Sequence, residues 1–161
     1  MATIEPFDTS GIARGPDGIA RYLDRPRSLV EMLRKTVERS PDHEAIVELG
    51  GERITYRQLW ERSTRVAGAL RALGIQHGDR VANRHANGLD WVLGFFGGLM
   101  AGAVVVPVNT RFAEPEVDYV VKDSGARFVL APGEPLPDGS PFALLSHTIS
   151  GRHSARNDCE C

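Results

Sequence analysis

Apolar residues recur every three to four positions in several stretches of the chain, a spacing that predicts amphipathic helices. Ser28 with Glu31 predicts a capping box at the start of the first helix, which Pro41 ends. Thr55 with Gln58 repeats that cap, and Gly74 ends the second helix. One face of the first helix is formed by Leu29, Met32, Leu33, Thr36 and Val37. The inward stripe expected for the second helix comprises Leu59, Ser63, Val66, Ala67, Leu70 and Leu73.

Two further helices are expected to alternate with short apolar strands. Asn87 with Asp90 predicts the start of the third helix, and Pro115 and Gly125 predict the first turn and the end of the fourth. The apolar side of the third helix is expected to comprise Leu89, Val92, Leu93, Phe96, Leu99 and Met100. Strands are predicted at 80–82, 103–108 and 127–130, and the helices between them imply parallel pairing.

An antiparallel hairpin precedes this alternation. Residues 44–49 and 52–55 flank Gly50 and Gly51, a pair that suits a tight two-residue turn. The predicted fold class is therefore α/β, a partial, open and mostly parallel sheet with flanking helices and a small antiparallel hairpin. Three segments are expected: an irregular leader at 1–27, the α/β part at 28–131, and a loop with a divergent, disordered tail at 132–161, of which only 142–145 could join a core.

Composition and charge are those of an ordinary soluble domain. The chain has 161 residues, 42% of them hydrophobic and 25% charged, and its 19 basic and 21 acidic side chains offer no broad positive field for nucleic acid. The N-terminus has no secretory pattern, and Cys159 and Cys161 lie too near the end to staple a fold, so a cytoplasmic location is expected. The uncharged run 91–108 has the length of a membrane span, but Gly102, Pro107 and its β-branched end favour a short helix followed by a strand.

Four short blocks, in order, carry a family resemblance: residues 54–59 (ITYRQL), 78–81 (GDRV), 99–109 (LMAGAVVVPVN) and 123–126 (DSGA). Together they resemble the N-terminal portion of an acyl-CoA synthetase or fatty-acid-CoA ligase, within the adenylate-forming (AMP-binding) enzyme superfamily. One departure from the family pattern is the polar run Asn83-Arg84-His85, where relatives have an apolar strand; buried polar groups there cost stability unless they are paired. The tail beyond Phe142 no longer resembles the family.

The resemblance implies a reaction for the full-length family, in which a carboxylate is adenylated by ATP with Mg²⁺ and then transferred to CoA as a thioester. That chemistry needs a Thr-Gly-x-Pro-Lys phosphate loop, a Glu for magnesium, an Asp for the ribose and a C-terminal Lys, and none of these motifs is found in the sequence. No catalytic, cofactor-binding or metal-binding residue is therefore assigned. No cofactor is expected for this chain, and whether it is an enzyme by itself is left open.

Three groups of residues have atoms suited to catalysis or metal binding, but their positions favour structural or solvent-exposed roles. Ser40, Asp42 and His43 are too close in sequence to form a catalytic triad, and His85 near Asp90 is more typical of a partly buried histidine with hydrogen-bond partners than of a base. His77 is expected to be solvated. His147, His153, Cys159 and Cys161 lack the spacing of a structural zinc site.

Two functional hypotheses follow from these observations. The first is an acyl-CoA synthetase shortened by truncation or by a shifted reading frame near Phe142, and inactive as an isolated chain. The second is a non-catalytic interaction module, because an incomplete sheet leaves an apolar face that would favour self-association or binding to another chain.

Overall fold

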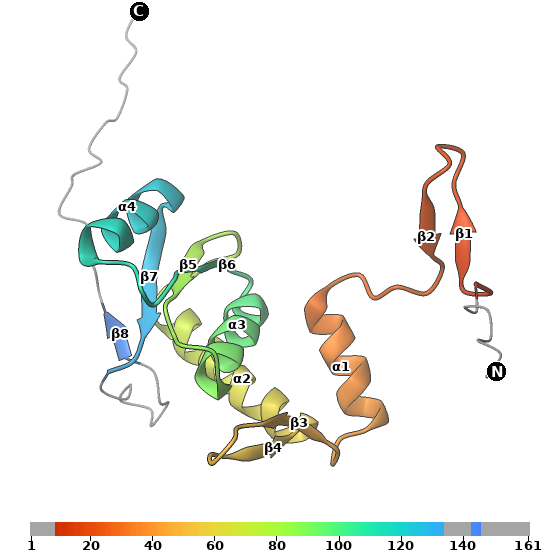
Figure 1. Ribbon diagram of the computed structural model, residues 1–161, viewed down its shortest axis with the longest axis horizontal. Helices are drawn as coiled ribbons and strands as arrows, with labels where there is room; N and C mark the ends of the chain where they lie inside the picture. The colour runs from red at the N-terminus through yellow and green to blue at the C-terminus, as the bar shows by residue number, and fades with distance from the viewer. Residues whose placement is uncertain (1–8, 134–142, 146–161) are drawn as a thin grey trace, which may run out of the picture.

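The computed structural model describes residues 9–133 and 143–145, and Figure 1 shows helices packed on a central sheet. Its strands are β5 (Arg80–Asn83), β6 (Val104–Pro107), β7 (Ala126–Ala131) and β8 (Ala143–Leu145), in the order β6-β5-β7-β8. Strand β5 pairs in parallel with β6 and β7, and β8 pairs antiparallel with β7. The predicted α/β class with a mostly parallel sheet is confirmed.

Helices cover both faces of this sheet. They are α1 (Leu29–Arg39), α2 (Tyr56–Ala72), α3 (Leu89–Ala101) and α4 (Glu114–Ser124). Residues of α1, α2 and α3 share one core cluster with Val81 and Leu130, whereas α4 packs in a second cluster with Ala82 and Val129. Because neighbouring residues of a strand point to opposite faces, α3 and α4 lie on opposite sides of the sheet (Figure 1).

Two antiparallel hairpins precede the sheet. The first, β1 (Ile12–Arg14) with β2 (Ala20–Tyr22), lies within the segment expected to be irregular and stands apart from the rest of the fold in Figure 1. Gly18, with φ of +74°, and an Arg21–Asp17 ion pair of 2.5 Å support its turn.

The second hairpin pairs β3 (Glu44–Val47) with β4 (Arg53–Thr55), as the sequence predicted. The expected two-residue turn is wrong. The amide of Glu48 donates to the carbonyl of Glu52 at 3.0 Å, so the turn is one residue longer, and only Gly50 has a positive φ, of +74°.

The predicted helix ends are mostly confirmed. The Thr55–Gln58 capping box is complete, and Gly74, Gly102 and Gly125 adopt positive φ where α2, α3 and α4 end. At α1 the box is only half formed: Ser28 Oγ accepts from the amide of Glu31 at 3.1 Å, but the Glu31 carboxylate accepts from the amide of Arg27, which lowers the pKa of Glu31.

The inward face of α3 differs from the expected one, because its most closely packed positions are glycines. A Cβ at Gly97 would lie 2.5 Å from Val66 Cγ1, and one at Gly98 would lie 2.6 Å from Val105 Cγ2. The expected face is only partly buried: Leu89 and Leu93 are buried, whereas Val92, Phe96, Leu99 and Met100 are intermediate. Helix α3 can approach α2 and β6 this closely only because these positions lack side chains.

A matched pair of glycine substitutions tests this close approach. Gly97→Ala should lower the free energy of unfolding by about 2 kcal/mol, because the stiff side chain of Val66 must shift. Gly68→Ala, on the exposed side of α2 with nothing within 4 Å of its Cβ, should raise it by about 0.5–1 kcal/mol through helix propensity. Urea unfolding followed by circular dichroism measures both, and equal effects of the two substitutions would contradict the packing argument.

Candidate functional site

The connections of the sheet create a natural ligand-binding position at the ends of β5 and β6. These two strands are neighbours, and the helices that follow them, α3 and α4, lie on opposite faces. A place where the helices after two neighbouring strands go to opposite faces of an open α/β sheet is called a switch point. It leaves a crevice at the carboxyl ends of the strands, where ligands commonly bind. The loops that follow β5 and β6 form the walls of a crevice at this position.

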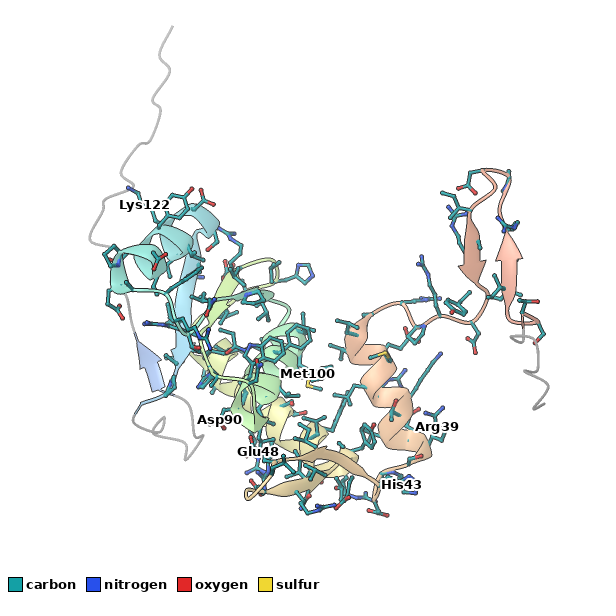
Figure 2. The ribbon with its side chains drawn as sticks, viewed as in Figure 1. Arg39, His43, Glu48, Asp90, Met100 and Lys122 are labelled. Carbon is teal, nitrogen blue, oxygen red and sulfur yellow. The ribbon has the colours of Figure 1, made fainter. Side chains whose placement is uncertain are left out.

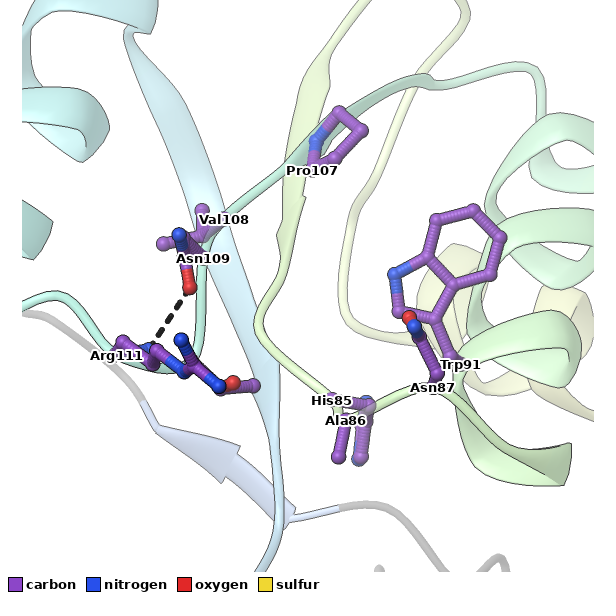
Figure 3. Close-up of a pocket in the computed structure, with 9 residues that line it drawn as sticks. His85, Ala86, Asn87, Trp91, Pro107, Val108, Asn109 and Arg111 are labelled. Atoms are coloured by element: carbon purple, nitrogen blue, oxygen red, sulfur yellow. Dashed lines mark hydrogen bonds between the residues drawn. The ribbon is translucent and has the colours of Figure 1, made fainter.

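A pocket of about 630 Å³ occupies this crevice (Figure 3), and we call it the switch-point pocket. Its volume is in the range typical of small-molecule sites. One wall follows β5, the other follows β6, and the lining residues are His85, Ala86, Asn87, Trp91, Pro107, Val108, Asn109, Thr110 and Arg111.

The wall that follows β6 is shaped by a short polar turn. The side chain of Asn109 accepts a hydrogen bond from the amide of Arg111 at 2.9 Å, shown dashed in Figure 3. Such Asx turns let the backbone reverse direction directly after a strand. Pro107 is compatible with the end of β6 because this strand lies at the edge of the sheet, where an amide facing away from β5 is not needed for pairing.

The wall that follows β5 is held by the polar run that departs from the family pattern. Asn83 is fully buried, its Nδ2 donates to the carbonyl of Trp91 at 3.0 Å, and its Oδ1 lies 3.0 Å from His85 Nδ1. The polar groups expected to cost stability unless paired are therefore paired. Gly94 leaves the space for this arrangement, because a Cβ there would lie 3.1 Å from Asn83 Nδ2.

Arg84, between these two residues, ties the end of β5 to the opposite wall. Its amide donates to the carbonyl of Leu130 at 2.8 Å, and its guanidinium reaches the Glu114 carboxylate at 2.8 Å and the carbonyl of Phe112 at 3.0 Å. Successive side chains of a strand point to opposite faces of the sheet, so Asn83 and Arg84 point to different sides. Asn83 therefore holds one wall of the pocket to α3, and Arg84 holds the other wall near the start of α4.

The residues that line the pocket have the chemistry of a binding site for a polar or anionic group. Among the described residues that line it, Arg111 is the one permanently charged side chain, and none of them carries a carboxylate. An anionic or polar group would therefore be favoured beside Arg111, with the Trp91 ring as an apolar surface. The lining residues do not fit Mg²⁺–ATP, which needs carboxylate oxygens for the metal and more than one cationic or amide contact for the phosphates.

The residues considered from the sequence do not form a catalytic centre in the part of the chain that the structure describes. Asp42 and His43 are exposed on the turn after α1, and Asp42 forms an ion pair with Arg57 at 3.2 Å. His77 is exposed as well. Residues 9–133 and 143–145 contain no group of three or more His, Cys, Asp or Glu that could hold a metal, and His147, His153, Cys159 and Cys161 lie outside them.

Sequence reasoning considered His85 and named Asn87 only as a helix start, and it did not single out Asn109 or Arg111. Asn109 and Arg111 lie within three residues of the end of the predicted strand 103–108, and that position is the signal that could have identified them. What the sequence could not give was that β5 and β6 are neighbours, which brings the two loops together.

The long apolar run considered as a membrane span is divided between α3 and β6. Among the described residues, no helix has both the length and the apolar character required to cross a bilayer. Gly94 and Gly98, which are four residues apart within α3, face the side chains of Asn83 and Val105 of the same chain.

Comparisons with known proteins agree with the class that the fold defines, an α/β protein with a crevice at the carboxyl ends of its parallel strands. The model of the AMP-binding enzyme family matches residues 33–157, so the chain belongs to that family. This range runs past Phe142, so the expectation that the tail beyond Phe142 does not resemble the family is wrong.

The relatives are acid–CoA ligases. A long-chain-fatty-acid–CoA ligase of Mycobacterium tuberculosis, FadD13, is 43% identical over 110 residues, which are 66% of this chain and 22% of that protein. A long-chain-fatty-acid–CoA ligase of Escherichia coli is 41% identical over 108 residues, 66% of this chain and 19% of the ligase. The chain thus spans about a fifth of the length of these relatives.

The fold agrees with this assignment. The crystal structure of the N-terminal domain of FACL13 from Mycobacterium tuberculosis superposes with a TM-score of 0.63 at 40% identity, covering 66% of this chain and 27% of that one. The predicted resemblance to the N-terminal portion of fatty-acid–CoA ligases is confirmed.

The buried histidine at the pocket gives a prediction about pH. Burial lowers the pKa of His85 from its ordinary value of 6.5, an effect that the nearby Asp90 carboxylate and the Ala131 backbone only partly oppose. The unfolded chain therefore takes up the proton first, so His85 should cost stability as the pH falls below about 6.5, by at most about 1.4 kcal/mol per unit of pKa lowering.

Urea unfolding at pH 7.5 and pH 5.5 tests this prediction. His85→Gln should show a smaller loss of unfolding free energy between the two pH values than the wild type. His43→Gln, which changes an exposed histidine, should keep the wild-type loss. Identical losses in the wild type and His85→Gln would contradict the assignment.

Proposed function

We propose that this chain is the N-terminal scaffold segment of an AMP-forming acyl-CoA synthetase. In the full-length family that enzyme adenylates a carboxylic acid with ATP and Mg²⁺ and then forms a thioester with CoA. The observation that carries the proposal is the 43% identity to FadD13 across a segment that folds here as a parallel sheet. Two long-chain ligases among the relatives favour a fatty acid as the substrate class. We also propose a cytoplasmic location, because the two cysteines, Cys159 and Cys161, are too close together to staple a fold.

The scaffold role follows from where the family-like residues lie. Thr55 caps α2, Gly102 ends α3, and Pro107 ends β6, so each of them shapes backbone. The sequence contains no Thr-Gly-x-Pro-Lys loop, and the part of the switch-point pocket that the structure describes offers one arginine and no carboxylate. We infer that residues 1–161 alone do not adenylate acids, and that Arg111 serves an anionic group of a substrate only when the remainder of a ligase is present.

An assay of pyrophosphate release tests the expected lack of activity. Purified chain with ATP, Mg²⁺, CoA and fatty or aromatic acids should release no pyrophosphate above the no-acid background, because the phosphate-binding devices are not present in its sequence. Full-length FadD13 under the same conditions is the positive control. Acid-dependent release by the purified chain would contradict the proposal.

A second candidate function, a non-catalytic interaction module, is favoured by exposed apolar residues in one stretch of the chain. Five large apolar side chains between residues 19 and 32 are 43–69% exposed, and we call them the N-terminal apolar cluster: Ile19, Tyr22, Leu23, Leu29 and Met32. Exposed large apolar residues that recur within one short stretch of chain favour association of that stretch with another surface. All five residues precede residue 33, where the family match begins.

Self-association through this cluster is measurable by sedimentation velocity over a range of concentrations. The wild type should form concentration-dependent oligomers, and Tyr22→Ser with Leu23→Ser should weaken them at least about tenfold, because burial of both side chains is lost. Leu49→Ser, at a fully exposed residue on the other hairpin, is the matched control and should leave association unchanged. A wild type that stays monomeric throughout would exclude this role.

A further inference from the structure

The start of α3 lacks a cap from its own loop. Gly88, the N-cap residue, has no side chain, and its extended backbone (φ 165°, ψ −171°) precedes the first helical amide. The side chains of Asn87 and Asp90, which the sequence favoured for this role, do not cap it. The first amides of a helix need an acceptor from elsewhere, since no preceding turn supplies one.

A residue from the second hairpin supplies that acceptor. The Oε1 atom of Glu48 accepts a hydrogen bond from the amide of Leu89 at 2.6 Å, across 41 positions of sequence. A negative carboxylate at a helix N-terminus also interacts favourably with the helix dipole. Figure 2 shows Glu48, at the end of the hairpin, beside the first turn of α3 that carries Asp90.

The glycine before α3 leaves the space that this contact needs. A Cβ at Gly88 would lie 2.6 Å from Glu48 Oε1, so any side chain there would displace the carboxylate. The backbone of Gly88 is extended and open to any residue, so conformational freedom does not require the glycine. A side chain at position 88 would instead take up the space that the Glu48 carboxylate occupies.

The loop held in this way forms a wall of the switch-point pocket. A second hollow, of about 610 Å³, separates the hairpin turn from α3, and Glu48, Asn87 and Gly88 are among its lining residues. Asn87 also lines the switch-point pocket. The loop between β5 and α3 therefore lies between the two, with the Glu48 carboxylate on one side and the pocket on the other.

We propose that Glu48 is a positioning residue for the switch-point pocket. By capping α3 from the hairpin, its carboxylate fixes the loop that carries Asn87 and the first turn that carries Trp91. A cap from a neighbouring residue would order the helix start only relative to its own loop, whereas Glu48 ties it to a separate element. The use of the pocket by a substrate rests on the proposed function, but the positioning itself does not.

Hydrogen exchange of the Leu89 amide, followed by NMR on the purified chain, tests the contact directly. Glu48→Ala should accelerate this exchange by about 5- to 30-fold, as the loss of a helix cap does. Glu48→Gln keeps an oxygen acceptor without the charge and should accelerate it only about threefold. Gly88→Ala should reproduce the effect of Glu48→Ala, and the double variant should add nothing to either, because both remove one contact.

NMR signals of residues in the pocket wall distinguish a positioning role of Glu48 from a purely stabilising one, which would leave these signals unchanged. The side-chain amide signals of Asn87 and the indole N–H of Trp91 should shift in Glu48→Ala and Gly88→Ala. Glu38→Ala removes a carboxylate paired with Arg34 on the exposed side of α1 and is the matched control, with no shift expected.

Three results would overturn the proposal: unchanged Leu89 exchange in Glu48→Ala, faster Leu89 exchange with unmoved Asn87 and Trp91 signals, or an equal loss of protection at Leu89 and at the core amides of Val81 and Val129. If Glu48→Ala is too unstable to study, Glu48→Gln and Gly88→Ala decide by the same criteria. No substrate is used, so a failure here is distinct from a failure of the proposed function.

Discussion

The close contact between the glycine face of α3 and its neighbours is the constraint on which the rest of the structure depends. Gly97 meets Val66 of α2, Gly98 meets Val105 of β6, and Gly94 admits the side chain of Asn83 from β5. Side chains at these positions would push α3 away from the sheet and from α2 together. With α3 held close, its first turn lies at the carboxyl end of β5, where the switch-point pocket forms.

Hydrogen bonds of buried polar side chains then hold the walls of the pocket in place beside α3. A buried amide is costly unless its donors and acceptors are satisfied, and Asn83 is satisfied by the carbonyl of Trp91 and by His85. Arg84 links the same strand end to the loop before α4. A run that departs from the apolar family pattern thus joins both walls of the pocket and gives this part of the sheet a specific polar geometry.

The features predicted from the sequence are those set by neighbouring residues. The Thr55–Gln58 box, the glycines that end the helices and the apolar strands each depend on a few adjacent positions, and the structure confirms them. The features that the sequence did not reveal depend on contacts between distant residues: the order β6-β5-β7-β8, the cap that Glu48 gives to α3, and the glycine face of α3. The pocket belongs to this second group, since His85 and Arg111 line the same pocket only because β5 pairs with β6.

We propose that this chain is a folded ligase scaffold with a crevice at the carboxyl ends of β5 and β6, and that adenylation requires the rest of a ligase. A chimaera tests most directly whether this segment can serve as the scaffold of a ligase. In it, residues 33–131 replace the matching segment of FadD13, and acyl-CoA formation is assayed with a long-chain fatty acid. The account predicts a folded protein whose kcat/KM stays within about tenfold of that of FadD13, a loss in transition-state stabilisation of up to about 1.4 kcal/mol. A chimaera with native-like circular dichroism and cooperative unfolding that forms no acyl-CoA would contradict it.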